Sequence, residues 1–430
     1  MKKYYSNPLS LLWLGWRFYR QFAAAEDYTE EQLRDYQYRH LKDTLAYAVR
    51  HVPYYREAYK AVGFELGDFK SIEDLSKLPF LTKDILRGRP HEDFLSDEAG
   101  RLGVSEIKTS GTTGVPLSFA CDLTARAAKY GITMRAFHEA GYSLGSMQFI
   151  LKNCFYADRA FSYSWLTNRV SMHAYMNSKE NARACDKLLR RHPPRHVLAH
   201  PNALLEFGKS IDDPSLTFRK TRGITSISEP LTSVLKSQIE DCFNSKVFDY
   251  YSNMESSLIA YETREKGYLL GEQFSYSEII PADITVPMNG EIVSTTFFSY
   301  AMPLIRYRNA DIVKLQANTN GGAFRQIQEV SGRIAETIVL PDGNKVRIFN
   351  LMHSQLDNVM MYQIVQNAKN HLFIDVVPLD KAKGVDMKSI IDELVSYVGS
   401  GMAMDVRVVE TLRKTEAGKT PRIISDIKNN

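Results

Sequence analysis

The sequence HVLAHPNALLEFGKS at residues 196–210, followed by GITSISEPLTSVLKSQIEDCFNSKVFDY at residues 223–250, decides the class of fold. Short apolar runs with the length of buried strands alternate here with segments whose apolar residues recur at helical spacing. The expected strands are 196–199, 223–226 and 246–250, and the expected helices are 202–210 and 231–243. Strands that alternate with helices form sheets whose neighbouring strands run in parallel. The stretch therefore predicts an α/β fold with a mostly parallel sheet and flanking helices.

The predicted alternation continues on both sides of this stretch. A long helix is expected over residues 29–62, broken at Pro53 because proline cannot continue a helix interior. Further strands are expected at 105–109, 117–121, 149–151 and 290–297, and further helices at 123–139 and 182–191. After about residue 332 the pattern changes to strands at 336–340, 362–366, 371–376 and 405–409, with a hairpin turn at 341–344 and helices at 349–357 and 387–398. We expect a large N-terminal domain, residues 1–332, which includes a helical segment over residues 1–62, and a small mobile α+β domain, residues 333–430.

The composition excludes several classes of protein. The chain has 430 residues, with 54 basic and 50 acidic side chains and a net charge of +4. This charge is too small, and too evenly spread, for a protein that binds nucleic acid. The four cysteines lack the spacing of metal ligands and are too few for a disulfide scaffold. These features predict a cytoplasmic protein whose cysteines are free thiols.

The N-terminus contains an apolar run, Leu9–Trp16, which is followed by Arg17 and Arg20. The run is too short to span a membrane, which takes about 20 apolar residues. An amphipathic helix over residues 9–19 that packs on its own domain is the favoured interpretation. Two alternatives are a peripheral membrane contact through Trp13, Trp16 and Arg17, and a secretion signal.

The first motif with chemical meaning is TSGTTGVP at residues 109–116. Gly111 and Gly114 permit backbone turns that can direct several N–H groups at one anion, and three hydroxyl side chains add further donors. No lysine follows the second glycine, so the motif is not the P-loop of nucleoside triphosphatases. It predicts a phosphate-binding loop, with a flexible turn as the alternative.

Two further motifs follow predicted strands. DYYSNME at residues 249–255 places aromatic rings and a carboxylate at a strand end, where an α/β sheet binds its ligands. A ring there can stack on a base, and the Glu255 carboxylate can hold Mg²⁺. PLIRYRNAD at residues 303–311 ends in Asp311, which can accept hydrogen bonds from a ribose. Taken singly, these residues are equally well explained as core tyrosines, surface acids and a turn aspartate beside solvated arginines.

The last two motifs lie near the expected domain boundary and near the C-terminus. Ser331-Gly-Arg333 stands where the pattern changes, and Thr415-Glu-Ala-Gly-Lys419 places a lysine on a glycine-flanked loop. Such a lysine can bring a mobile positive charge to a phosphate, although a single surface lysine is usually only solvated.

The five motifs, in this order, resemble those of the adenylate-forming superfamily of acyl-CoA synthetases, luciferases and peptide-synthetase adenylation domains. The chain looks most like the phenylacetate–CoA ligase branch, and especially its CapK-like members of capsular polysaccharide biosynthesis. The resemblance covers roughly residues 30–425 and includes VPYYR at 52–56, ISEPL at 227–231 and YQIVQ at 362–366.

The resemblance implies roles for individual residues. The phosphate loop corresponds to Ser110, Gly111, Thr112, Thr113 and Gly114. The nucleotide site also includes Glu229, Pro230, Tyr251, Ser252, Asp311 and Arg333, with Tyr251 stacked on the adenine and Asp311 on the ribose. Glu255 corresponds to the Mg²⁺ ligand, and Lys419 to the lysine that catalyses adenylation beside Arg333. The acid pocket is less well marked; Phe155, Tyr156 and His200 are the candidates because they follow strands.

The implied reaction is ATP-dependent activation of a carboxylic acid as an acyl-adenylate, with release of pyrophosphate and transfer to CoA or another thiol. An amide ligase that acylates an amino sugar in capsule or O-antigen biosynthesis is one alternative, and an inactive nucleotide-binding scaffold is another. The chain departs from the family pattern at Met254, at Asn309-Ala310 and at Ala335-Glu336. The last departure lies where the family has its hinge, so adenylation is better supported than transfer to CoA.

Overall fold

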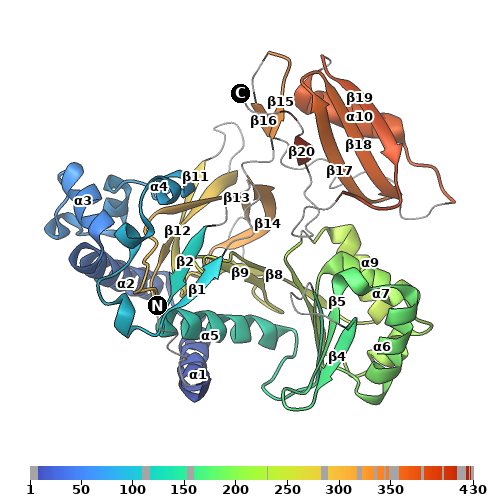
Figure 1. The fold of residues 1–430 in the computed structure, drawn as a ribbon, viewed down its shortest axis with the longest axis horizontal. Coiled ribbons are helices and arrows are strands. Elements are labelled where there is room, and N and C mark those ends of the chain that lie inside the picture. Colours follow the sequence, from blue (N-terminus) through green and yellow to red (C-terminus); the bar gives the residue numbers. More distant parts are fainter. Residues whose placement is uncertain are drawn as a thin grey trace.

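The computed structural model describes residues 8–108, 117–152, 159–229, 231–281, 289–316, 322–333, 337–342, 345–347, 358–378, 382–399, 401–413, 423–425 and 427. Figure 1 shows a broad body and, at the upper right, a smaller lobe formed by the last elements of the chain.

Three helices open the chain: α1 (Pro8–Ala25), α2 (Glu30–His51) and α3 (Pro53–Ala61). The Thr29 side chain caps α2 and accepts a hydrogen bond from the Gln32 backbone amide, while the Gln32 side-chain oxygen accepts one from the Thr29 backbone amide. Pro53 is the first residue of α3, which confirms the predicted interruption. Short helical turns and α4 (Lys83–Gly88) lead to the first strands.

One sheet of twelve strands forms the frame of the large body. Its strands are β3 (Gln148–Lys152), β4 (Phe161–Ser164), β5 (Arg169–His173), β6 (His196–Ala199), β7 (Gly223–Ile227), β8 (Val247–Ser252), β9 (Ile259–Glu262), β10 (Tyr268–Leu270), β11 (Ser275–Pro281), β12 (Asn289–Thr296), β13 (Tyr307–Gln316) and β14 (Gln326–Arg333). Their order is β11-β12-β13-β14-β10-β9-β8-β7-β6-β3-β5-β4. The accompanying helices are α5 (Leu123–Glu139), α6 (Lys179–Arg191), α7 (Pro201–Ser210), α8 (Pro214–Thr217) and α9 (Ser233–Phe243). The α/β class is thus confirmed.

The expectation of a mostly parallel sheet needs correction. Strands β5, β3, β6, β7 and β8 are parallel neighbours. The opening stretch predicts β6, β7 and β8, and β3 corresponds to the strand expected at 149–151, whereas β5 was not predicted. From β8 to β11 every pairing is antiparallel, and β4 is antiparallel to β5. The reason lies in the connections, because β8, β9 and β10 are joined by short turns, which return the chain in the opposite direction.

A separate hairpin, β1 (Ser105–Lys108) and β2 (Ser118–Cys121), flanks the predicted phosphate loop, and residues 109–116 of that loop lie outside the described residues. Lys108 pairs with Ser118, so the two ends of the loop are held together. Asp122 then caps α5 and accepts a hydrogen bond from the Ala125 amide. The start of α5 therefore agrees with the prediction.

The smaller lobe has its own sheet and its own hydrophobic cluster. Strands β17 (Val359–Ala368), β18 (His371–Pro378), β19 (Ala403–Val408) and β20 (Ile423–Ser425) have the order β19-β18-β17-β20, with helix α10 at Met387–Val398. Its centre includes Ile364, Leu372, Ile374, Ile390 and Leu394. The hairpin β15 (Thr337–Val339) and β16 (Lys345–Arg347) precedes it, as predicted. The helix predicted over 349–357 lies outside the described residues, and the boundary at 332/333 stays a prediction.

Helix α1 packs tightly across α5. A Cβ added to Gly131 of α5 would lie 2.6 Å from the Phe18 Cβ and 2.8 Å from the Gly15 carbonyl oxygen. At the end of α1, the buried Glu26 forms an ion pair of 2.7 Å with Arg135 of α5. The favoured interpretation of the N-terminal helix, packing on its own domain, is confirmed. Among the described residues, no helix combines the length and the apolar character needed to cross a membrane.

This contact gives a stability prediction. Gly131→Ala is expected to lower the free energy of unfolding by about 1–3 kcal/mol, because the added methyl group must push the two helix backbones apart. Gly67→Ala is the matched control, since a Cβ there has nothing within 4 Å. Urea unfolding followed by circular dichroism measures both variants. Equal stability of the two would contradict the tight crossing.

Candidate functional site

The carboxyl ends of β6, β7 and β8 form one edge of the parallel part of the sheet. These strands are neighbours, and they end at Ala199, Ile227 and Ser252. His200, Glu229 and the segment 251–255 therefore lie along the same edge. This is where an α/β sheet binds its ligands, so the topology agrees with the predicted position of the site.

His200 and Glu229 are direct neighbours at this edge. The His200 Nδ1 lies 3.8 Å from a Glu229 carboxylate oxygen, and the Asn202 side-chain amide donates a hydrogen bond of 2.8 Å to the other oxygen. Ser228, just before Glu229, has a φ of +68°, which turns the chain sharply after β7. The candidate acid-pocket histidine and the candidate adenine-pocket glutamate thus share one corner of the site.

Tyr251 and Asp311 meet, although they are 60 positions apart in the chain. The Tyr251 hydroxyl, at the end of β8, donates a hydrogen bond to the Asp311 carboxylate in β13. In the sheet order β9, β10 and β14 separate these two strands, so the sheet must curl to bring them together. The candidate adenine-stacking ring and the candidate ribose-binding carboxylate belong to one site.

Arg333 lies directly opposite Asp311. The two residues are paired across the antiparallel β13 and β14, and Arg333 is the last residue of β14. Two residues predicted from separate motifs are therefore adjacent on neighbouring strands. The chain leaves the large sheet from this point.

Glu255 follows β8 and is tied to a third element of the site. The Tyr307 hydroxyl donates a hydrogen bond of 3.0 Å to a Glu255 carboxylate oxygen. The Tyr307 ring also packs edge-on against Phe119 of β2, with ring centroids 6.1 Å apart. Because β2 follows the predicted phosphate loop, the strand after that loop runs close to the predicted metal ligand.

Lys129 is a site residue that the sequence did not indicate. Its ammonium, on α5, lies 3.4 Å from the Asn253 carbonyl oxygen. Burial lowers the pKa of Lys129 to about 8, while the Glu255 carboxylate acts in the opposite direction. A lysine in the middle of a helix carries no local signal of this kind, because its position depends on the packing of α5 against the segment after β8.

The backbone before Asp311 has an unusual conformation. Ala310 has a φ of +69°, a region that favours glycine. The Asn309 side-chain oxygen accepts a hydrogen bond of 3.0 Å from the Asp311 amide, and Lys83 donates one of 3.0 Å to the Asn309 carbonyl oxygen. The departure from the family pattern at Asn309-Ala310 therefore leaves the turn held by side-chain contacts.

Ala310→Gly is expected to raise the free energy of unfolding by roughly 0.5–1 kcal/mol. Glycine removes the steric strain of a positive φ, and the energy gained in this way exceeds the entropy that glycine loses on folding. Thermal or urea unfolding measures the change. Ala323→Gly is a comparison at a position without a positive φ, and it should not stabilise the protein. A loss of stability in Ala310→Gly would contradict the conformation described for the turn.

The two arginines before Asp311 both form ion pairs, which their interpretation as solvated neighbours did not include. Arg306 is buried and forms a two-pronged ion pair with Glu278, and its guanidinium lies 4.0 Å from the centre of the Phe80 ring. Arg308 pairs with the buried Glu291. Both side chains are engaged in holding the strand that carries Asp311.

Several predicted residues cannot be placed from the structure. Those outside the described residues are Ser110, Gly111, Thr112, Thr113, Gly114, Phe155, Tyr156, Pro230 and Lys419. Ser252 is described and ends β8, beside Tyr251. The predicted roles of all these residues stay predictions.

The side chains at the site fit a metal ion that takes some of its ligands from the protein and the rest from a bound nucleotide. No group of three or more His, Cys, Asp or Glu side chains capable of holding a metal occurs in the described part of the chain. Mg²⁺ is commonly held by one or two carboxylates together with the phosphates of a nucleotide. The single Glu255 carboxylate suits that arrangement better than a dedicated metal cage.

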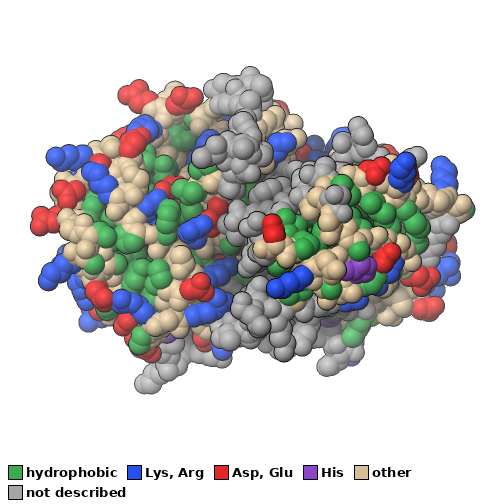
Figure 2. Space-filling view, turned by 90° about the horizontal axis from the view of Figure 1, so that it is seen from above, with side chains coloured by type: hydrophobic (Ala, Val, Ile, Leu, Met, Phe, Trp, Pro, Cys, Tyr) green, Lys and Arg blue, Asp and Glu red, His purple; other side chains and the backbone are tan. Residues whose placement is uncertain are grey.

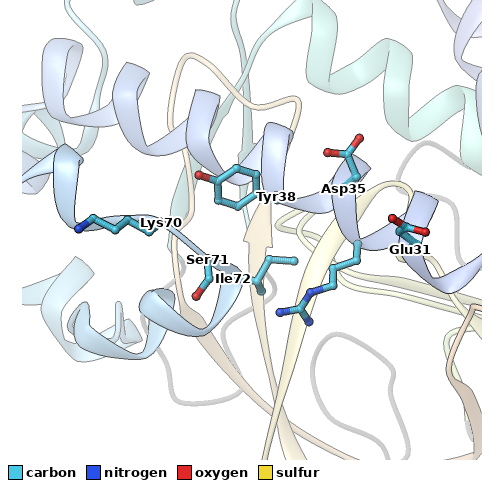
Figure 3. Close-up of a pocket in the computed structure, with 7 residues that line it drawn as sticks. Glu31, Asp35, Tyr38, Lys70, Ser71 and Ile72 are labelled. Atoms are coloured by element: carbon cyan, nitrogen blue, oxygen red, sulfur yellow. The ribbon is translucent and has the colours of Figure 1, made fainter.

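A depression elsewhere on the surface does not contain the predicted site. It has a volume of about 260 Å³ and lies between α2 and the segment 70–72 (Figure 3). Charged side chains, among them Glu31, Arg34 and Asp35, form much of its wall, and Arg34 is paired with Glu73. On the face shown in Figure 2, basic and acidic side chains are interspersed.

Comparison with known proteins gives consistent relatives. Residues 338–426 match the CapK C-terminal domain family. The chain is 26% identical to phenylacetate-coenzyme A ligase of Aromatoleum evansii over 78% of this chain and 77% of the relative. It is 22% identical to Protein CapK of Staphylococcus aureus over 89% and 87% of the two chains. Among solved structures, 2-hydroxyisobutyryl-CoA ligase in its postadenylation state superposes with a TM-score of 0.68 at 18% identity, covering 90% of this chain and 88% of that one.

These findings confirm the resemblance seen in the motifs, and they extend over both parts of the molecule. The superposition accounts for the large sheet and the second lobe, and the family match covers most of that lobe. The chain is therefore a homologue of the phenylacetate–coenzyme A ligases and of CapK, with the fold of the adenylate-forming CoA ligases and a CapK C-terminal domain.

Proposed function

We propose that the protein is an ATP-dependent ligase that activates a carboxylic acid as an acyl-adenylate, releases pyrophosphate and transfers the acyl group to coenzyme A. The observation that carries this proposal is the meeting of Tyr251, Asp311 and Arg333, which come from three separate motifs. The names of the relatives support it, since four phenylacetate-coenzyme A ligases are similar to the chain.

The proposed first step brings two anions together. The substrate carboxylate attacks the α-phosphorus of ATP, a new C–O–P linkage forms, and the bond to pyrophosphate breaks. Fixed hydrogen-bond donors and positive charges lower the activation barrier of this step, because they stabilise the negative charge that moves onto the leaving pyrophosphate. The backbone amides and hydroxyls of residues 110–114, together with Arg333 and Lys419, supply them.

The nucleotide itself is oriented by residues along the edge of the sheet. Tyr251 provides a ring for the adenine, Glu229 and Pro230 line the same pocket, and Asp311 accepts hydrogen bonds from the ribose. The Tyr251–Asp311 hydrogen bond holds both side chains in place before the nucleotide arrives, which lowers the entropy cost of binding.

Glu255 is the proposed ligand of Mg²⁺, which neutralises phosphate charge when it is bound. The Tyr307 hydroxyl orients the Glu255 carboxylate, and the Lys129 ammonium lies at the nearby Asn253 carbonyl. We assign Lys129 a positioning role, in which it holds the segment 253–255 against α5. His200, with Phe155 and Tyr156, is the proposed wall of the acid pocket.

The second step is proposed to use a thiol, and an amine is the alternative acceptor. The match of residues 338–426 to the CapK C-terminal domain favours keeping an amide ligase for capsule or O-antigen amino sugars as a second candidate. In both schemes the small domain, from residue 333 onward, carries Lys419 to the site.

A panel of carboxylic acids tests the proposal. Pyrophosphate release is measured with ATP, Mg²⁺ and each acid, and hydroxylamine traps any acyl-adenylate as a hydroxamate. Added coenzyme A should give a thioester and raise turnover if a thiol is the acceptor, whereas an amino sugar should do so if the protein is an amide ligase. Failure of every acid to yield pyrophosphate and hydroxamate would leave only the inactive scaffold.

A further inference from the structure

All three tryptophans of the chain are exposed. Trp13 is 58% exposed, Trp16 50% and Trp165 80%. Tryptophan is mostly buried in globular proteins, so three exposed rings in one chain call for a physical explanation. Two of the rings lie on α1 and the third lies in the turn between β4 and β5.

Helix α1 has two apolar faces. Gly15 and Phe22 are buried on the face that packs on α5 and the body of the domain. The other face carries Leu9, Leu12, Trp13 and Trp16, which recur at helical spacing and are 71%, 43%, 58% and 50% exposed. The Arg17 and Arg20 guanidiniums lie over the Trp13 and Trp16 rings, at 4.8 and 5.0 Å. An apolar outward face on a helix marks a surface that binds a further partner.

A second exposed apolar cluster lies at the amino ends of the parallel strands. Trp165 and Leu166 occupy the turn before β5 and are 80% and 79% exposed, and Leu144, in the loop before β3, is 69% exposed. The two segments touch, because Asn168 donates a side-chain hydrogen bond of 3.0 Å to the Gly145 carbonyl oxygen. In Figure 1 this turn and α1 both lie at the lower edge of the molecule.

The edge of the sheet at the amino ends of the parallel strands also carries several exposed basic side chains. Arg191 is the last residue of α6, which leads into β6, and the loop before β7 carries Arg219, Lys220 and Arg222; all four are exposed. Backbone hydrogen bonds join these loops, from the Arg195 amide to Met147 and from the Arg222 amide to Arg195. The Tyr163 ring stacks on His192 at 4.8 Å, which ties the β4–β5 hairpin to the loop before β6.

We propose that this lower surface, formed by the outward face of α1, the β4–β5 turn and the loops before β3, β6 and β7, docks the protein on an anionic lipid bilayer. Tryptophan and leucine side chains enter the interface between head groups and acyl chains, while arginine and lysine contact lipid phosphates. Exposed rings beside arginines, on a helix face and a turn rather than in a groove, suit a bilayer better than a peptide.

The topology gives the proposal a consequence. The docking surface lies at the amino ends of the parallel strands, whereas His200, Glu229 and Tyr251 lie at their carboxyl ends. A protein bound through this surface would keep its candidate active site on the side facing away from the bilayer. Docking therefore does not rest on the proposed ligase activity, and the two can be tested separately.

Vesicle binding and tryptophan emission test the proposal with the full chain. Vesicles of phosphatidylcholine mixed with phosphatidylglycerol should co-sediment the protein, and pure phosphatidylcholine vesicles should do so much less. Because every tryptophan lies on the proposed surface, anionic vesicles should shift the emission to shorter wavelength. High salt should reverse much of the binding, because it screens the basic loops.

Paired variants make the test specific. Trp13→Ser/Trp16→Ser and Trp165→Ser/Leu166→Ser should each lower the vesicle partition coefficient by about tenfold or more. Arg191→Ser/Lys220→Ser should lower it by about fivefold for each charge removed. Val62→Ser, at an apolar side chain that is 52% exposed at the end of α3, is the matched control and should bind like the wild type.

Two results would overturn the proposal. One is a wild-type protein that stays in the supernatant with unshifted emission at low salt. The other is a dimer in solution that Trp13→Ser/Trp16→Ser dissociates, in a protein that binds no vesicles, since the surface would then join two copies of the chain. Circular dichroism of each variant checks that the fold is retained.

Discussion

Glu255→Gln is expected to lower the rate of acid-dependent pyrophosphate release by about 10²–10³-fold. The substitution removes the negative charge that the proposed Mg²⁺ site requires but keeps the shape of the side chain and an oxygen that can accept the Tyr307 hydrogen bond. The fold should therefore be retained, and the loss should appear in turnover. Steady-state rates of pyrophosphate release at saturating ATP, measured over a range of Mg²⁺ concentrations, check this result.

The control for Glu255→Gln is Glu265→Gln, because Glu265 is an exposed glutamate in the turn between β9 and β10. That variant should react like the wild type. A weakened dependence on Mg²⁺ in Glu255→Gln alone would support metal binding at this carboxylate. Unchanged turnover and unchanged Mg²⁺ dependence in Glu255→Gln would remove Glu255 from the mechanism.

Lys419→Ala is expected to lower the rate of adenylation by about 10²-fold or more, comparable to the loss of one preorganised donor of charge. The lysine stands on a glycine-flanked loop, so its removal should leave stability unchanged. Thioester formation from a synthetic acyl-adenylate and coenzyme A should continue, because that half-reaction does not require the phosphate charge to be stabilised. Pyrophosphate release and thioester formation, measured separately, distinguish the two steps.

Lys369→Ala is the matched control for Lys419→Ala. Lys369 is an exposed lysine in the turn between β17 and β18 of the same lobe, and its loss should change neither step. If Lys419→Ala releases pyrophosphate at the wild-type rate, another cation must serve the first step. Lys129, whose ammonium lies 3.4 Å from the Asn253 carbonyl oxygen, would then be the first residue to substitute.

The secondary structure that the sequence predicts best is the part fixed by local signals. Helices α5 and α10 have the predicted limits, 123–139 and 387–398, because Asp122 and Asp386 cap them with side-chain hydrogen bonds to the first backbone amides. Strands β6 and β7 are short apolar runs that are each followed by a helix. Strand β13, YRNADIVKLQ, escaped prediction because its charge pattern is not that of a buried strand, and the local pattern does not reveal that Arg308 pairs with Glu291 of the neighbouring β12.

The candidate site also combines residues that the sequence identifies with residues that only the structure reveals. The motifs identify Tyr251, Asp311 and Arg333 by residue type and order, and Tyr251 and Asp311 each had an ordinary structural explanation when taken alone. Their proximity is a property of the curled sheet, which brings β8 against β13 and pairs Asp311 with Arg333. Lys129 and Tyr307 could not have been chosen from the sequence, since only burial and contact with the segment 253–255 distinguish them.

The sequence by itself determined the α/β class, the positions of the capped helices and the order of the five motifs, because these depend on the spacing and side-chain chemistry of residues close together in the chain. The tertiary structure decided the antiparallel half of the sheet, the meeting of Tyr251 with Asp311, and which face of α1 is buried. Those features come from contacts between residues far apart in the chain. Such contacts form only when the apolar surfaces of distant segments are buried together, and no local pattern specifies which surfaces will meet.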